Sequence, residues 1–134
     1  MPVVEHRRER RTFEPTDSAP ALSRQFVREM LEVWHADDLA DTAELLTTEL
    51  VTNVVRHAAG EVGVDLEWAE PTLRVEVRDG SSILPAVQDL PGEHGGYGLR
   101  LVAALVREWG VDADGDGKAV WFTLDRSADQ RPGS

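Results

Sequence analysis

The chain has 134 residues, contains no cysteine and carries a formal net charge of −11. This length is typical of one domain with a real core, and a sequence without cysteine excludes disulfides and thiolate metal sites. It contains no apolar run of about 18 residues, so we expect no membrane span. The N-terminus lacks the apolar segment of a signal peptide, which favours a cytoplasmic protein. The acidic charge argues against direct binding of nucleic acid.

The two ends of the chain are rich in charged and polar residues. We expect residues 1–10 to form a flexible N-terminal segment and residues 126–134 to form a loose tail. The four arginines of residues 5–11 are a candidate binding arm. Four arginines alone are weak evidence of a binding surface, so we favour a solvated segment. The domain itself is predicted to span residues 11–125.

A short edge strand over residues 11–14 is predicted to precede two helices. Apolar residues at helical spacing predict the first helix over residues 19–35. The second helix is expected to begin after a cap at Asp37 or Asp38 and to end near Gly60, the usual stop. The apolar stripe of the second helix comprises Leu39, Ala43, Leu46, Leu50 and Val54.

Strand signals dominate the second half of the chain. Strict alternation predicts an antiparallel hairpin over residues 62–68 and 73–78. Residues 80–96 are rich in glycine and proline and predict a long loop, which in a compact domain is functional or disordered. A helix over residues 98–110 and a last hairpin over residues 111–124 follow. The order of elements indicates an α+β fold, a two-layer sandwich with helices on one face of a mostly antiparallel mixed sheet.

Two polar residues on the second predicted helix are the first candidates for chemistry. Glu49 and Asn53 are four residues apart, so they stack on the flank of the apolar stripe. Removing these two side chains from water at this place is costly, so we expect a polar group or ligand to contact them. An asparagine oxygen can ligate Mg²⁺ beside phosphates, and a glutamate can act as a general base. The plainer alternative is a surface pair on an ordinary helix.

Two further motifs follow along the chain. Asp79 ends a predicted strand and can accept a hydrogen bond from an exocyclic amine such as that of adenine; the alternative is a simple turn cap. Residues 95–98 bring glycine-rich backbone into a helix N-terminus, where free N–H groups can bind phosphates. These glycines are otherwise only a helix start, and Tyr97 either stacks on a nucleotide or covers the loop.

Four segments carry a family resemblance through their order. They are Glu49-Leu-Val-Thr-Asn53-Val-Val-Arg-His57-Ala, Val77-Arg-Asp79-Gly-Ser, Gly95-Gly-Tyr-Gly98-Leu-Arg-Leu-Val and Gly117-Lys-Ala-Val-Trp-Phe122. Together they resemble the histidine-kinase-like (GHKL) ATPase superfamily, and within it the small stand-alone anti-sigma-factor serine kinases. The resemblance covers about residues 10–125. It implies a Bergerat-type sandwich, ATP and Mg²⁺ as ligands, and often a homodimer.

The resemblance also implies a role for each matching position. Asn53 would ligate Mg²⁺, Glu49 would activate a serine hydroxyl of a partner protein, and Asp79 would bind the adenine amino group. Residues 83–95 would form a lid. The other nucleotide-binding positions that it implies are His57, Ser81, Gly95, Gly96, Tyr97, Gly98, Leu99 and Lys118, with Gly96 and Gly98 against the phosphates. From its place in the apolar stripe, we interpret His57 as a structural, hydrogen-bonded histidine rather than a catalyst.

The sequence departs from the family pattern at two places. Ser81 stands where the family usually has glycine, and its side chain would crowd the adenine. Lys118 stands where the family often has threonine; it would either reach a phosphate or be solvated.

The function that the resemblance implies is an ATP-dependent serine kinase that sequesters a sigma factor and phosphorylates an anti-sigma antagonist protein. The alternative, which Ser81 favours, is a non-catalytic ATP-binding or nucleotide-free module that regulates a partner by stoichiometric binding.

Overall fold

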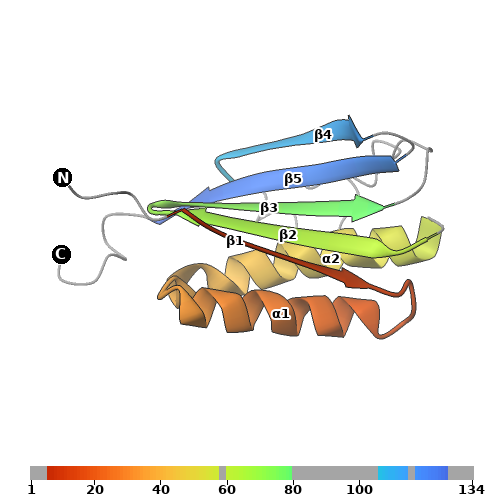
Figure 1. Cartoon of the computed structure of the whole chain (residues 1–134), viewed down its shortest axis with the longest axis horizontal. Coiled ribbons are helices and arrows are strands. Elements are labelled where there is room, and N and C mark those ends of the chain that lie inside the picture. Colours follow the sequence, from red (N-terminus) through yellow and green to blue (C-terminus); the bar gives the residue numbers. More distant parts are fainter. Residues whose placement is uncertain (1–5, 58–59, 80–105, 115–116, 127–134) are drawn as a thin grey trace.

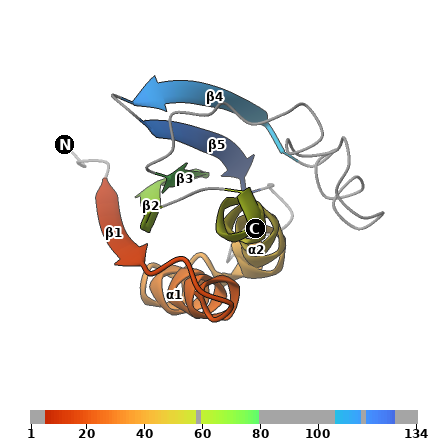
Figure 2. The same ribbon diagram turned by 90° about the vertical axis from the view of Figure 1, so that its right-hand side faces the viewer.

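The structure is a computed structural model that describes residues 6–57, 60–79, 106–114 and 117–126. These residues form two layers, a five-stranded sheet and two α-helices packed on one of its faces (Figure 1, Figure 2). The predicted α+β sandwich is therefore confirmed. Within the described ranges, neither helix is long and apolar enough to cross a membrane.

The elements follow the predicted order closely. They are β1 (Arg7–Phe13), α1 (Ala19–Val33), a 3₁₀ turn η1 (Asp37–Leu39), α2 (Ala40–His57), β2 (Val62–Ala69), β3 (Thr72–Asp79), β4 (Glu108–Asp114) and β5 (Gly117–Asp125). The strands lie side by side in the order β1-β2-β3-β5-β4. Every pairing among the described strands is antiparallel. The first two predicted helices and the predicted hairpin of β2 and β3 are confirmed.

The core lies between the helices and the sheet, where the apolar residues of α1, α2, β2, β3 and β5 meet. On β2 and β3 the alternating apolar residues are buried, whereas the residues between them on β3 are only partly buried. The apolar stripe of α2 meets them from the other layer. The largest fully buried side chains include Phe26, Leu31, Leu46, Leu66, Leu73 and Phe122.

An ion pair links the two helices at the edge of this core. Arg28 on α1 lies 2.6 Å from Glu44 on α2, measured from Nη2 to Oε2. The hydrogen bond with Glu44 raises the pKa of Arg28. Because the Arg28 side chain is half exposed, this pair orients the helices more than it stabilises them.

Thr47 is a polar residue inside the core. Its exposed fraction is 0%, and its hydroxyl has no hydrogen-bond partner among the residues that the structure describes. A buried hydroxyl without a partner costs free energy. We therefore expect Thr47→Val, which keeps the side-chain shape, to raise the free energy of unfolding by about 1 kcal/mol. Urea unfolding would measure it; Thr42→Val, on the same helix but half-buried, should stay within about 0.5 kcal/mol of the unmodified chain. A destabilised Thr47→Val would contradict this account.

The first strand is longer than predicted. β1 begins at Arg7 rather than Arg11, so residues 7–10, expected in the flexible segment, pair with β2 instead. The physical reason is a set of side-chain contacts across the strands. Arg10 donates two hydrogen bonds to Asp65, at 2.6 and 3.0 Å. A local pattern of charged residues does not reveal that a neighbouring strand supplies opposite charges.

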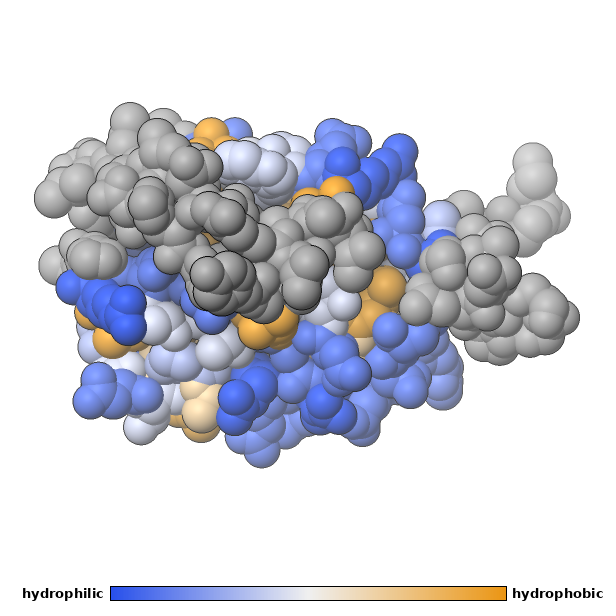
Figure 3. Space-filling view, turned by 180° about the vertical axis from the view of Figure 1, so that it is seen from behind, coloured by the Kyte–Doolittle hydropathy of each residue, from blue (hydrophilic) through white to orange (hydrophobic). Residues whose placement is uncertain are grey.

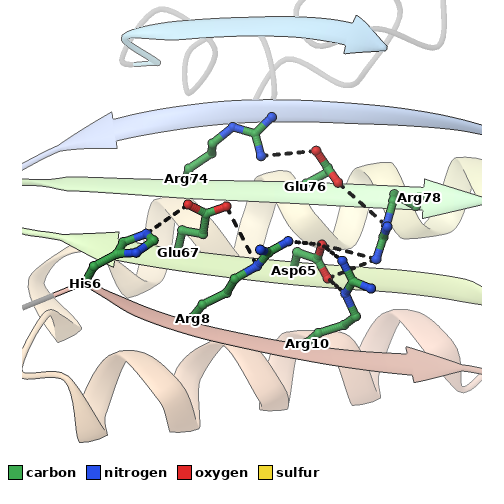
Figure 4. A network of polar contacts seen from close by, with 8 residues as sticks. All are labelled: His6, Arg8, Arg10, Asp65, Glu67, Arg74, Glu76 and Arg78. Carbon is green, nitrogen blue, oxygen red and sulfur yellow. Dashed lines mark hydrogen bonds and ion pairs between the residues drawn. The ribbon is translucent and has the colours of Figure 1, made fainter. Parts of the chain in front are cut away.

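A network of charged residues covers the sheet face that points away from the helices (Figure 4). At its centre is Asp65, whose side chain is only 3% exposed. Arg10, Arg8 and Arg78 lie 2.6, 3.6 and 3.2 Å from its carboxylate oxygens. The network comprises His6, Arg8, Arg10, Asp65, Glu67, Arg74, Glu76 and Arg78. It ties β1, β2 and β3 together from the outside.

The predicted helix over residues 98–110 is wrong at its end, because residues 108–110 belong to β4. Trp109 is paired with Phe122 and Gly110 with Trp121 on β5. A Cβ atom on Gly110 would lie only 2.9 Å from the indole of Trp121, so glycine here admits that ring rather than ending a helix. The other segments predicted at residues 1–5, 80–105 and 127–134, the long loop and lid among them, lie outside the described residues.

Arg126 corrects the prediction of a loose tail that starts at this residue. It is 6% exposed, and its guanidinium lies over the ring of Trp68, 5.1 Å from the centroid. It donates to the Asp38 carboxylate at 2.8 and 3.0 Å, to Glu70 at 3.2 Å and to the carbonyl oxygen of His35. The residue after β5 thus joins the turn of β2 and β3 to the connection between the helices.

Candidate functional site

Glu49 and Asn53 lie in the C-terminal half of α2, where the sequence places them at the edge of its apolar stripe. Both are half-buried, whereas Leu46 and Leu50 on the same helix are buried. The neighbouring Thr52 hydroxyl donates to the carbonyl oxygen of Thr48 at 2.7 Å, so this hydroxyl is satisfied within α2. The two polar side chains are therefore partly withdrawn from water but accessible to a ligand.

Asp79 is the last residue of β3, and its side chain is only 2% exposed. Its cross-strand partner on β5 is Lys118. The Lys118 ammonium lies 3.3 Å from an Asp79 carboxylate oxygen, and the lysine side chain is 12% exposed. The alternative of a solvated Lys118 is therefore wrong. This ion pair is nearly dry, and neither partner could be buried at low cost without the other.

These two groups of residues occur at the same end of the molecule. The C-terminal end of α2, the end of β3 and the start of β5 lie together in Figure 1 and remain together in the rotated view of Figure 2. α2 and β3 are also in direct contact. The fold thus brings Glu49 and Asn53 to the end of the sandwich that carries the Asp79–Lys118 pair.

The remaining predicted site residues are not placed by the structure. Ser81, Gly95, Gly96, Tyr97, Gly98 and Leu99 lie outside the described residues. The backbone of His57 ends α2, but its side chain is not described. The predicted roles of these residues therefore stay predictions.

The described residues suit a nucleotide better than a metal ion held by the protein alone. In the described part of the chain, no three His, Asp or Glu side chains gather as a metal site. A carboxamide such as that of Asn53 can supply one oxygen to Mg²⁺ when phosphates supply others. A buried carboxylate at a strand end can accept hydrogen bonds from the edge of a base. The donor set therefore fits Mg²⁺ bound together with a nucleotide.

On the side seen in Figure 3, the surface of the described residues is mainly hydrophilic. Figure 3 shows separate hydrophobic patches rather than one broad apolar face on the described part of that side. This agrees with an acidic, charge-rich chain.

The chain belongs to the histidine kinase-like ATPase domain family, which residues 13–124 match. No curated protein sequence matches this chain. Among solved structures, it is similar to the RsbU and RsbW domains of Rv1364c from Mycobacterium tuberculosis, with a TM-score of 0.66 and 23% sequence identity. The similarity covers 91% of this chain and 34% of that one, so this chain spans about a third of that structure. At this identity the likeness supports the fold.

Sequence reasoning missed two contacts, one at the candidate site and one at the opposite end of β5. The pairing of Asp79 with Lys118 depends on β3 and β5 being neighbours, although 37 residues, 80–116, separate the two strands in the sequence. The only local sign of this pairing was that two residues of opposite charge stand at the ends of predicted strands. Nothing in the local sequence marks Arg126 as a buried residue.

Proposed function

We propose that this chain binds ATP with Mg²⁺ and transfers the γ-phosphoryl group to a serine hydroxyl of an anti-sigma antagonist protein, and that it also binds a sigma factor. The observation that carries this proposal is the contact between α2, which holds Glu49 and Asn53 in its C-terminal half, and β3, which ends at Asp79, in a histidine kinase-like ATPase domain. The similar solved structure contains an RsbW domain, and the likeness supports the fold that this proposal assumes.

Each described residue has a chemical task in this proposal. Asn53 would supply one ligand oxygen to Mg²⁺, which neutralises charge on the phosphates. Asp79 would accept a hydrogen bond from the amino group of the base. Glu49 would accept the proton of the serine hydroxyl as the serine oxygen bonds to the γ-phosphorus, and the bond to the bridging oxygen of ADP breaks. The half-buried position of Glu49 suits a base that must face a partner protein.

Glu49→Gln tests the catalytic part of the proposal. This variant keeps the size and hydrogen bonding of the side chain but cannot accept the proton. We expect ATP affinity by calorimetric titration to change little, and phosphotransfer to a purified anti-sigma antagonist to fall by about 100-fold or more. Glu32→Gln, at an exposed glutamate of α1, is the matched control and should leave both quantities unchanged. Full transfer by Glu49→Gln would remove the base role.

A second function has an observation in its favour. Lys118 already occupies one oxygen of the Asp79 carboxylate, which would weaken a contact with adenine. The chain would then regulate its partner by stoichiometric binding without nucleotide. Partner capture that ignores added Mg–ATP and survives Asn53→Ala supports this function, whereas capture that depends on nucleotide opposes it.

A further inference from the structure

Lys118 and Asp79 present a hydrogen-bond donor and an acceptor side by side at the candidate site. They are directly opposite each other on β5 and β3, with the ammonium 3.3 Å from the carboxylate. Their side chains are 12% and 2% exposed. An ammonium donates three hydrogen bonds and a carboxylate accepts about four, so an ion pair of this kind can serve further partners while it stays intact.

The stability of the fold does not by itself require an ion pair at these two positions. A buried ion pair is often replaced by apolar residues of similar volume without loss of stability. Lys118 is also the only lysine of the chain, whereas arginine supplies every other fixed positive side chain. A lysine ammonium is a compact charge that fits beside a carboxylate without the planar fork of arginine.

Adenine and guanine present opposite hydrogen-bonding groups at position 6, the position that such a pair would contact. Adenine carries an amino group at position 6, which is a donor, whereas guanine carries a carbonyl oxygen, which is an acceptor. A lone carboxylate accepts from the amino group of adenine but repels the carbonyl of guanine. An ammonium beside the carboxylate can donate to that carbonyl, while the carboxylate accepts from the neighbouring ring N–H of guanine.

We propose that Lys118 and Asp79 together read position 6 of a purine, so that the site accepts both ATP and GTP. This inference rests on the proposed nucleotide binding and adds the class of nucleotide to it. Asp79 holds the amino group of adenine, and Lys118 holds the carbonyl of guanine. Lys118 is therefore a specificity-determining residue rather than a ligand of the phosphates.

The first test uses the unmodified full chain and four nucleotides, each with Mg²⁺, in calorimetric titration. ATP carries the amino group, GTP and ITP carry the carbonyl, and purine riboside triphosphate carries only hydrogen at position 6. We expect the dissociation constants of ATP, GTP and ITP to agree within about tenfold, and purine riboside triphosphate to bind about tenfold or more weakly than each. This comparison needs no variant to fold.

The second test removes the donor with Lys118→Met, which has a similar length and no charge. We expect the ratios of GTP affinity to ATP affinity and of ITP affinity to ATP affinity to fall by about tenfold or more in this variant. Arg107→Met is the matched control, since it removes a positive charge paired with Asp125 at the other end of β5. It should leave the ratio of GTP to ATP affinity unchanged. Urea unfolding of both variants checks that they are folded.

The outcomes separate this inference from the proposed function. An unmodified chain that binds ATP but rejects GTP and ITP by more than about 100-fold overturns the inference and leaves the proposed function intact. Equal losses of ATP and GTP in Lys118→Met also overturn it, because they indicate only a general charge effect. If the unmodified chain binds none of the nucleotides, the proposed function fails and the inference fails with it.

Discussion

Asn53→Ala is expected to abolish Mg²⁺-dependent ATP binding, with an affinity loss of about 100-fold or more. Asn53 is the only asparagine of the chain and lies half-buried one turn before the end of α2. Mg²⁺ takes few protein ligands beside phosphates, so the loss of one ligand oxygen has a large effect. Calorimetric titration with ATP, with and without Mg²⁺, measures the change.

Two further variants make this experiment specific. Asn53→Asp keeps a ligand oxygen and should retain metal-dependent binding, whereas Gln25→Ala removes an exposed amide from α1 and should change nothing. ATP binding in the absence of Mg²⁺ should be nearly equal for Asn53→Ala and the unmodified chain. Retention of the Mg²⁺ effect by Asn53→Ala would contradict the metal role of this residue.

Arg126→Ala is expected to lower the free energy of unfolding by about 3 kcal/mol. The Arg126 side chain is 4% exposed and pairs with Asp38 and Glu70, which are 23% and 56% exposed. The exposure of these two partners keeps the loss at the lower end for a buried ion pair. The hydrogen bond with Asp38 raises the pKa of Arg126, so the guanidinium stays charged at every pH at which the fold is normally studied.

Urea unfolding followed by circular dichroism measures this loss. Arg126→Lys should be intermediate, because lysine keeps the charge but not the planar fork that reaches several acceptors. Arg24→Ala, at an exposed position of α1, is the control and should change the free energy of unfolding by less than about 0.5 kcal/mol. A loss below about 1 kcal/mol for Arg126→Ala would show that the cluster around this residue does not hold the sheet to the helices.

The bounds of an element were predicted correctly where the sequence pattern was local. They were predicted incorrectly where pairing with another strand sets them. Alternation over residues 62–68 and 73–78 predicted the hairpin of β2 and β3 because the apolar residues of each strand lie on the face that packs against the helices. The end of the predicted helix failed because residues 108–110 gain their hydrogen bonds from β5. A helical pattern of apolar residues cannot report a partner strand that comes later in the chain.

In the candidate site, too, the local spacing on a helix was predictable and the contact between two strands was not. The stacking of Glu49 and Asn53 follows from a spacing of four residues on a helix, and their half-buried position agrees with the predicted flank of the stripe. The contact between Asp79 and Lys118 does not follow from any spacing. It exists because β3 and β5 became neighbours, which placed opposite charges at 3.3 Å in a nearly dry position.

The order of four motifs indicated the family to which this protein belongs. The amino-acid sequence by itself also determined which faces of the strands and helices are apolar, and therefore the two layers of this protein. Periodicity carries this information because it is written in neighbouring residues. Only the tertiary structure decided that Asp65 binds three arginines, that Arg126 is buried and that Lys118 pairs with Asp79. A buried charge is stable only beside a partner, and the partners of these residues lie on other elements, far along the chain.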